Sequence, residues 1–454
     1  MMEIGEQLAL FNLVTTLTPS IPGNGASFND PAFATNKALP IHRWVPWIAG
    51  FARDFVADVL TRYLPVCGTV LDPFSGVGTT LVEAVLGGHS AIGFEINPYA
   101  ALASRVKATA YGISVSDFHE SIKNFRTFYQ ESTTGEYTPK SEPPAGFKTR
   151  SAFYSPIVLR KVLVAQDFIA TITDHAIRDL FRLAFAATMV RYSNYSYEPS
   201  LGRRVSAGKE EITDFPVGKT LLEKLCLMVE DIAWFQTYLP APAPQVQVIN
   251  DSFFNYAAHL SPESVDLVVT SPPYLNNYHY NRNTRPQLYW LGFAEEAQDL
   301  KPLEHANFGK YWQTVRGNAR LDLEFSLSSS DLEERLADLR QKNPDKGVYG
   351  GHGWANYAAA YFNDCYHFSQ GLQYALKPGG TALVVIGNSI LQGIAISTDQ
   401  YLGKIAELVG LELVGIEIPR ATRVGNSIIQ SEVRVAKAKD SQRLYEAIVE
   451  LRKR

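Results

Sequence analysis

Residues 69–80, with the sequence TVLDPFSGVGTT, decide the fold expected for this chain. The apolar run at residues 69–71 reads as a buried strand, and residues 79–86 resume with helical spacing. Gly76 and Gly78 between them permit a tight turn. In a doubly wound sheet such a loop lies at the carboxyl end of the first strand, where backbone N–H groups and the amino end of the helix can face an anionic ligand. The stretch therefore predicts an α/β fold with a ligand site at that edge of the sheet.

A second expected strand, residues 90–94, ends at Glu95. An acid at this position can accept hydrogen bonds from both ribose hydroxyls of an adenosine-containing cofactor. A phosphate-binding loop of the nucleotide hydrolases would need a lysine after Gly78, where this chain has Thr79. A nicotinamide dehydrogenase would need a third glycine where this chain has Leu81. Both of these functions are disfavoured, and a glycine pair that serves only the turn is the structural alternative.

A second tract, TSPPY at residues 270–274, follows the apolar run at residues 265–269. That run suits the middle of a parallel sheet that is covered on both faces. Pro272 and Pro273 fix the backbone and supply no N–H, so the carbonyl groups there are available as acceptors at the carboxyl edge. The alternative is a proline turn that ends a strand beside an ordinary core tyrosine.

The TSPPY tract has the groups needed to activate an exocyclic amine. The amine of cytosine or adenine is a poor nucleophile because its lone pair is delocalised into the ring. Hydrogen bonds to the Ser271 hydroxyl and the Pro272 carbonyl would draw the amine toward tetrahedral geometry. Tyr274 would supply a face on which an extruded base can stack. Direct transfer of a methyl group to the amine nitrogen needs no nucleophilic residue in the protein. In agreement, no cysteine follows a proline as it does in the carbon-5 cytosine methylases.

Together these tracts resemble the S-adenosylmethionine-dependent DNA amino-methyltransferases of the cytosine-N4 and adenine-N6 type. The resemblance rests on DPFSGVGTT, on FEINPYA at residues 94–100 and on TSPPY. It implies that the glycine loop holds the methionine part of S-adenosylmethionine, that Glu95 holds the ribose and that TSPPY holds the target amine. The implied catalytic residues are Ser271, Pro272, Pro273 and Tyr274. The implied cofactor-binding residues are Asp72, Phe74, Gly76, Gly78, Thr79, Thr80, Glu95, Asn97, Asp251 and Ser252, and no metal is implied.

Serine at the first position of the tract is similar to cytosine-N4 enzymes, so a site-specific methyltransferase acting on cytosine N4 of a flipped base is expected. Adenine N6 is the first alternative. An RNA methyltransferase of the guanine-N2 type is a weaker one, since such enzymes usually carry a separate amino-terminal RNA-binding domain. A nucleic-acid-binding subunit without turnover is disfavoured by the intact tracts.

The resemblance implies a doubly wound, Rossmann-like methyltransferase sheet with an antiparallel closing hairpin and a mostly helical insertion. Further strands are expected at residues 246–249, 381–386, 411–418 and 432–436, of which the last two form the closing pair. The segment HRWVPW at residues 42–47 resembles the element that covers the methionine side. The expected boundaries are 1–112 for the N-terminal segment and cofactor loop, 113–244 for the helical insertion, 245–292 for the catalytic segment, 293–355 for a second insertion and 356–454 for the C-terminal part of the methyltransferase domain.

The insertion at residues 113–244 is the candidate target-recognition region. Residues 148–209 carry ten Lys and Arg against four Asp and Glu, and a local basic face can neutralise phosphates although the net charge is −4. Residues 191–204, rich in Tyr, Ser, Asn and Arg, are the best candidates for contact with DNA. Residues 275–285 could line a base pocket or form a lid. Residues 316–345 are expected to be mobile until DNA binds.

Composition sets the remaining limits. A chain of 454 residues with 46% apolar content can bury a large core in one elaborated domain or two. Cys67, Cys226 and Cys365 are odd in number and widely spaced, so neither a disulfide framework nor a zinc site is expected. The sequence has no secretory start and no apolar span of membrane length. We therefore expect a cytoplasmic protein that acts on double-stranded DNA, with protein partners in a restriction or phage-defence system.

Overall fold

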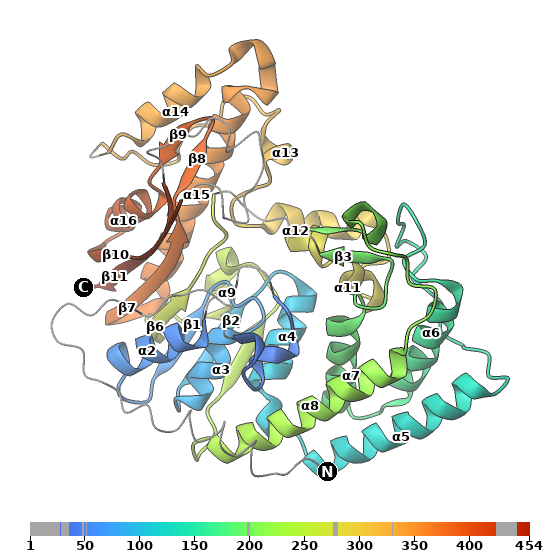
Figure 1. The fold of residues 1–454 in the computed structure, drawn as a ribbon. Helices are drawn as coiled ribbons and strands as arrows, with labels where there is room; N and C mark the ends of the chain where they lie inside the picture. The colour runs from blue at the N-terminus through green and yellow to red at the C-terminus, as the bar shows by residue number, and fades with distance from the viewer. Residues whose placement is uncertain are drawn as a thin grey trace.

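A seven-stranded sheet forms the centre of the computed structural model, which describes residues 28, 36–47, 50, 52–197, 200–275, 280–328, 330–423 and 443–454 (Figure 1). Its strands are β1 (Thr69–Asp72), β2 (Ser90–Phe94), β5 (Val246–Ile249), β6 (Val265–Thr270), β7 (Leu376–Gly387), β10 (Leu411–Arg423) and β11 (Arg443–Lys453). Their order is β10-β11-β7-β6-β1-β2-β5. β11 is antiparallel to both neighbours, and the other adjacent pairs are parallel. This arrangement confirms the doubly wound sheet with an antiparallel closing hairpin.

The position predicted for the last strand of the hairpin needs correction. The strand that pairs with both β7 and β10 is β11, and residues 432–436 lie outside the described part of the chain. The apolar run Ala447, Ile448 and Val449 at the middle of β11 is fully buried. Residues 432–436 alternate apolar and charged side chains and residues 447–449 are continuously apolar, and both patterns are compatible with a strand. The pairing with β7 identifies the strand that contains residues 447–449.

Alternate residues of the central strands enter two separate cores. Val70 of β1 packs into one core with α2, α3 and α4, whereas Leu71 packs into the other with α14, α15 and α16. These helices are α2 (Arg53–Tyr63), α3 (Thr79–Leu86), α4 (Pro98–Ala108), α14 (Leu332–Arg340), α15 (Gly351–Ala375) and α16 (Thr398–Leu408). Both faces of the sheet are therefore covered, which is why its strands are continuously apolar.

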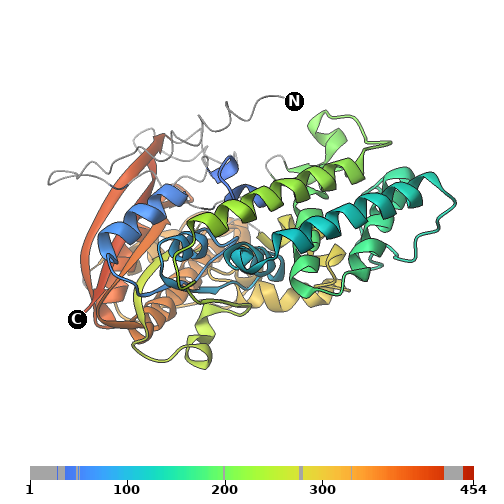
Figure 2. The same cartoon turned by 90° about the horizontal axis from the view of Figure 1, so that it is seen from below.

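The first insertion is mostly helical, as expected. It contains α5 (Val115–Thr134), α6 (Pro156–Thr171), α7 (His175–Thr188) and α8 (Val217–Tyr238), with a hairpin of β3 (Tyr195–Tyr197) and β4 (Leu201–Arg203). Side chains of Ser114, Ser155 and Asp174 cap the first three of these helices. Figure 2 shows the long helices α5 and α8 side by side. One apolar core runs from these helices to the sheet, so the boundaries at residues 113 and 244 stay predictions.

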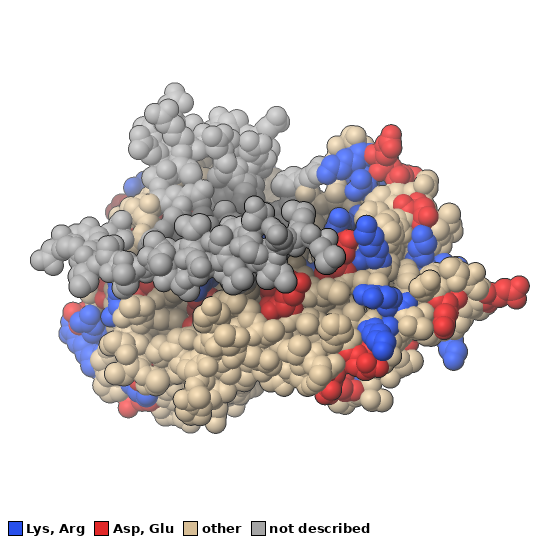
Figure 3. Space-filling model, turned by 60° about the horizontal axis from the view of Figure 1, so that its bottom comes forward, with Lys and Arg blue, Asp and Glu red and all other residues tan. Residues whose placement is uncertain are grey.

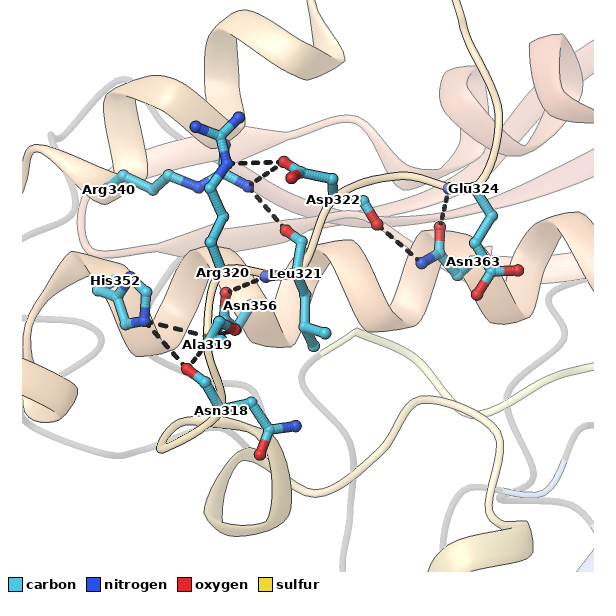
Figure 4. Close-up of polar contacts among 10 residues, drawn as sticks. All are labelled: Asn318, Ala319, Arg320, Leu321, Asp322, Glu324, Arg340, His352, Asn356 and Asn363. Carbon is cyan, nitrogen blue, oxygen red and sulfur yellow. Dashed lines mark hydrogen bonds and ion pairs between the residues drawn. The ribbon is translucent and has the colours of Figure 1, made fainter.

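Part of the segment 316–345, which the sequence predicts to be mobile until DNA binds, is hydrogen-bonded to α15 in the described structure. The buried amide of Asn356 on α15 donates to the carbonyls of Asn318 and Ala319 and accepts from the N–H of Leu321 at 3.0 Å (Figure 4). About two helical turns further along α15, the side chain of Asn363 accepts a hydrogen bond from the N–H of Glu324 at 3.0 Å. These amides hold the backbone of residues 318–324 against α15, and mobility of this segment stays a prediction.

Short elements connect these parts. They are η2 (His42–Trp44), η3 (Ala110–Gly112), η4 (Arg204–Ala207), η5 (Phe253–Asn255), α9 (Tyr256–His259), α10 (Tyr280–Asn283), α11 (Arg285–Trp290), η6 (Ala297–Leu300), α12 (Lys301–Ala306), α13 (Trp312–Val315), η7 (Pro344–Tyr349), β8 (Ser389–Leu391) and β9 (Ile394–Ile396). Within the described ranges, no helix combines the length and the hydropathy that a bilayer span requires.

A buried carboxylate on α8 fixes the N-terminal segment against the first insertion. Asp231, 1% exposed, accepts hydrogen bonds from the Ile41 N–H at 2.8 Å, from the Trp44 indole at 2.8 Å and from two nitrogens of Arg43. Ile41 has a φ of 63°, a conformation that a β-branched residue adopts only when its surroundings impose it. The Asp231 contacts therefore hold a strained turn directly before Trp47, which lines the site described below.

Replacing Asp231 by alanine should lower the free energy of unfolding by about 3 kcal/mol, because it leaves buried N–H donors and the Arg43 guanidinium without their acceptor. Equilibrium denaturation in urea measures this change. Glu230→Ala, at the exposed neighbouring position of the same helix, is the control and should change the free energy by less than about 0.5 kcal/mol. Equal effects of the two substitutions would contradict the anchoring role.

Candidate active site

A cavity lies where the chain leaves the carboxyl ends of β1, β2, β5 and β6. Its empty volume is about 730 Å³, part of which is open to solvent. Its lining residues are Trp47, Pro73, Phe74, Gly76, Phe94, Glu95, Ile96, Asn97, Ser252, Phe253, Phe254, Ser271, Pro273, Asn281, Ala306, Asn307 and Phe308. The glycine loop and the TSPPY tract thus share one cavity, although almost two hundred residues separate them in the sequence.

The two glycines of the loop have different surroundings. Both have a positive φ, 50° at Gly76 and 82° at Gly78, which explains why glycine occupies both positions. Gly76 lines the cavity, and a Cβ there would lie 3.2 Å from the Trp47 indole nitrogen. Gly78 lies away from the cavity wall, and a Cβ there would lie 2.7 Å from the Ser104 hydroxyl. Gly78 therefore permits close packing of α3 on α4, whereas Gly76 is positioned to face a ligand.

Three residues predicted to bind the cofactor lie behind the cavity wall. The Asp72 carboxylate, 1% exposed, accepts hydrogen bonds from the hydroxyls of Thr80 and Thr270, each at 2.7 Å, and from the Phe74 N–H at 3.1 Å. Burial raises the pKa of Asp72 to about 6, although these hydrogen bonds act to lower it. Thr79 is buried beside Thr80 at the start of α3. Asp72 and Thr80 therefore join β1, α3 and β6, and they shape the cavity from behind.

Glu95 is the acid expected to face the ribose, and it does line the cavity. Its carboxylate accepts hydrogen bonds from the N–H groups of Gly76 at 2.9 Å and Asn97 at 2.8 Å. Burial raises the pKa of Glu95 to about 7 in spite of these N–H donors, and the nearby Asp72 charge adds to the rise. The Glu95 carboxyl group therefore changes its protonation state near neutral pH.

Asn97 lies in the cavity wall, but its side chain is bound to protein groups. Its Oδ1 caps α4 by accepting from the N–H groups of Tyr99 at 3.1 Å and Ala100 at 3.3 Å. Its Nδ2 donates to Thr284 at 2.7 Å and to Asn281 at 3.2 Å. Asn97 therefore links the cofactor side of the cavity to α10 and α11.

The two residues predicted at the end of β5 have separate positions. Ser252 lines the cavity, and its hydroxyl accepts from the Phe254 N–H at 3.3 Å. Asp251 lies outside the wall and pairs with His259 at 2.8 Å and with Asn255 at 2.9 Å. Partial burial acts to raise the pKa of Asp251, but the hydrogen bonds from His259 and Asn255 outweigh it and lower the pKa.

The TSPPY tract presents Ser271 and Pro273 to the cavity. The Pro273 carbonyl accepts from the hydroxyl of Tyr361 on α15 at 3.1 Å, and Pro272 is buried outside the wall. Tyr274 also lies outside the wall. Its hydroxyl donates to Glu446 of β11 at 3.0 Å, and its ring covers Gly387, where a Cβ would lie 2.7 Å from the ring. Stacking of a base on Tyr274 therefore stays a prediction.

The sequence analysis missed part of the wall, which the second insertion supplies. Phe308 packs edge to face on Phe74, with ring centroids 5.2 Å apart, and stacks on Phe254 at 6.1 Å. No local pattern marks Phe308, because its position depends on long-range packing. Asn281 of α10, which belongs to the segment 275–285 expected to line a base pocket or form a lid, also lines the cavity. The HRWVPW segment was a usable signal, since its last residue, Trp47, does line the cavity.

Comparison with known proteins gives relatives that cover most of the chain. The Type II methyltransferase M.BsoBI of Geobacillus stearothermophilus is 24% identical over 442 residues, which cover 87% of this chain and 83% of that protein. The Type II methyltransferase M.AvaI of Nostoc sp. is 24% identical over 424 residues, covering 87% of this chain and 84% of that protein. No protein-family model matches the chain.

Among solved structures, the rRNA methyltransferase aviRa from Streptomyces viridochromogenes matches 93% of this chain and 93% of its own, at 9% identity and a TM-score of 0.30. The fold assignment rests instead on the strand order and directions described above. That strand order, the shared cavity and the two relatives agree with the resemblance drawn from the motifs. The chain is similar over most of its length to the Type II methyltransferases M.BsoBI and M.AvaI.

Proposed function

We propose that this protein transfers a methyl group from S-adenosylmethionine to the N4 amine of a cytosine flipped out of double-stranded DNA. The observation that carries the proposal is the shared cavity, which Ser271 and Pro273 line together with Gly76 and Glu95. A methyl donor and a target amine must meet at near-attack distance, and one cavity between these two tracts provides the place.

The cavity wall suits an adenosine-containing cofactor. Glu95 offers acceptors for the ribose hydroxyls, and the fixed N–H donors of Gly76 and Asn97 orient its carboxylate. The rings of Phe254 and Phe308 offer apolar surface for an adenine. When bound, S-adenosylmethionine supplies an electrophilic methyl group.

The residues after β6 would hold and activate the amine. The Ser271 hydroxyl, which lines the cavity, would accept a hydrogen bond from the amine and localise its lone pair, which stabilises charge that develops only in the transition state. Acceptance by the carbonyl of Pro272, a residue outside the wall, stays a prediction. The Tyr361 hydrogen bond to the Pro273 carbonyl and the Tyr274 hydrogen bond to Glu446 keep the tract rigid. Positioning of this kind needs no nucleophilic side chain.

DNA would approach over the first insertion. Several of its cations are bound to protein groups: Arg160 to backbone carbonyls, Lys161 to Asp214 and Arg182 to Asp179. Figure 3 shows the Lys and Arg of this side interspersed with Asp and Glu. The exposed Arg191 and Arg203 flank the β3–β4 hairpin, so they are the better candidates for phosphate contact. The names of the relatives support a Type II restriction-modification role for this proposal.

The proposed reaction has a direct test. The protein is incubated with S-adenosylmethionine that carries a tritiated methyl group and with mixed unmethylated DNA or, in a parallel reaction, with RNA, and the nucleic acid is digested to nucleosides. We expect the label in N4-methylcytosine. Label only in N6-methyladenine would replace cytosine by adenine, whereas transfer to guanine in RNA, or no transfer at all, would refute a DNA methyltransferase.

Ser271→Ala should lower kcat by about 100- to 1,000-fold, because one acceptor of the developing charge is removed. The dissociation constant for S-adenosylhomocysteine should change less than about twofold, since the substitution removes an interaction made in the transition state. Single-turnover kinetics and calorimetric titration separate the two effects. Ser264→Ala, at the other end of β6, is the control and should retain the wild-type kcat. Unchanged turnover of Ser271→Ala would remove this serine from the mechanism.

Cofactor affinity should depend on the protonation of Glu95, whose pKa lies near 7 when no ligand is bound. Ribose hydroxyls donate to the ionised form, so binding lowers the pKa and affinity falls as the pH falls through 7. We expect the dissociation constant of 5′-methylthioadenosine to rise about tenfold from pH 8 to pH 6. This ligand has no α-amino group that titrates in that range.

The matched variant for this pH dependence is Glu95→Gln, which keeps the shape of the side chain and removes the titration. Its affinity for 5′-methylthioadenosine should be weaker than wild type at pH 8 and nearly independent of pH. If the wild-type affinity were already constant between pH 6 and pH 8, Glu95 would not be the ribose acceptor.

A further inference from the structure

Asn281 on α10 carries a buried donor that no protein group satisfies. The residue is 4% exposed, it lines the cavity, and its Nδ2 has no hydrogen-bond partner among the residues that the structure describes. Leaving a buried donor unpaired costs free energy, so such groups in folded proteins call for an explanation. A ligand atom inside the cavity would supply the missing partner.

The neighbours of Asn281 fix which of its two amide atoms is left without a protein partner in the described part of the chain. Asn97 Oδ1 accepts from the N–H groups of Tyr99 and Ala100, so the Asn97 atom that points toward Asn281 must be Nδ2. That donor requires an acceptor, and Asn281 therefore presents its Oδ1 to Asn97 at 3.2 Å. The remaining Asn281 Nδ2 is a donor, and the ligand atom that meets it must be an acceptor.

The hydrogen bonds place this donor on the cofactor side of the cavity. Asn281 is bonded to Asn97, which follows β2, whereas Ser271 follows β6, and β1 lies between those two strands. Glu95, Asn97 and Asn281 form one hydrogen-bonded series, and the indole nitrogen of Trp47 lies close by Gly76 on the same side. Asn97, the residue to which Asn281 is bonded, follows β2, so it is two strands away from the end of β6, where a base held at Ser271 would lie.

The charges of the wall identify the kind of acceptor. Among the described residues that line the cavity, Glu95 is the only ionisable one, and it is assigned to the ribose. The methionine part of the cofactor carries a carboxylate, which is a stronger acceptor than any hydroxyl. With no lysine or arginine in this described wall, a carboxylate has to be held by neutral donors.

We propose that Asn281 Nδ2 donates a hydrogen bond to the carboxylate of the methionine part of S-adenosylmethionine, an inference that rests on the proposed function. The same helix carries Asn283, whose carbonyl accepts from the Tyr197 hydroxyl at 3.0 Å and whose Oδ1 accepts from the Leu201 N–H at 3.1 Å. Asn281 therefore connects the cofactor carboxylate to the helix on which the β3–β4 hairpin is docked.

The test compares two ligands that differ in the amino-acid group. S-Adenosylhomocysteine contains the carboxylate, whereas 5′-methylthioadenosine has the same adenine and ribose and lacks it. In calorimetric titrations of the full-length protein, Asn281→Ala should raise the dissociation constant of S-adenosylhomocysteine about 10- to 100-fold. The dissociation constant of 5′-methylthioadenosine should stay within about twofold of wild type.

Two further variants separate recognition from folding. Asn281→Asp keeps the size of the side chain and the acceptor for Asn97, and it replaces the donor by an acceptor, so it should lose S-adenosylhomocysteine selectively as well. Asn283→Ala removes a contact of the same helix outside the cavity wall, and the ratio of the two dissociation constants should remain that of wild type. Thermal unfolding of each variant checks that it is folded.

The results that would overturn the proposal are distinct. If Asn281→Ala and Asn281→Asp weakened the affinity for both ligands equally, Asn281 would be a structural residue. Unchanged binding of S-adenosylhomocysteine in both variants would assign the donor to another ligand, such as the target base. Wild-type protein that bound neither nucleoside would instead refute the proposed cofactor, and with it the function on which this inference depends.

Discussion

The buried carboxylate of Asp72 connects the parts on which the cavity depends. Asp72 is the last residue of β1. Its carboxylate accepts one hydrogen bond from the Thr80 hydroxyl at the start of α3 and another from the Thr270 hydroxyl at the end of β6. Because β6 leads directly into Ser271, these two hydrogen bonds set the glycine loop and the TSPPY tract in a fixed relation. Ionising Asp72 in the folded protein costs on the order of 3 kcal/mol relative to the unfolded chain, given a pKa raised from 3.8 to about 6. The position of both tracts is therefore maintained against an electrostatic penalty.

The cavity wall also contains polar groups that are held in place at a cost in free energy. Glu95 is half-buried, and desolvation raises its pKa to about 7. The Asn281 Nδ2 has no partner among the described residues, so the wall contains groups that the described protein atoms do not fully satisfy. The side chains of Asp72, behind the wall, and of Asn97, in the wall, are instead hydrogen-bonded to protein partners. This contrast distinguishes groups that build the site from groups arranged for a ligand.

Two segments outside the sheet complete the wall. The N-terminal segment brings Trp47 to the glycine loop and is held there by Asp231 of the first insertion. The second insertion brings Phe308 over Phe74, and the Asn356 amide fixes its following backbone on α15. Both insertions thus contribute to the structure of the cavity, in addition to any contact with DNA.

Local sequence patterns were enough to predict the doubly wound sheet, the glycine loop and the presence of Glu95 and Ser271 at the cavity. Each of these follows from a local pattern: an apolar run, a glycine or proline that limits the backbone, and a polar residue at the carboxyl end of a strand. Long-range contacts in the folded protein were needed to show that Gly78, Asp72 and Thr80 lie behind the wall, that Tyr274 packs on Gly387, and that β11 comprises Arg443–Lys453. The same kind of contact brings Asn281 and Phe308 into the cavity wall. These outcomes depend on contacts between residues that are far apart in the chain, where packing and hydrogen-bond pairing select one arrangement among several that local sequence permits equally well.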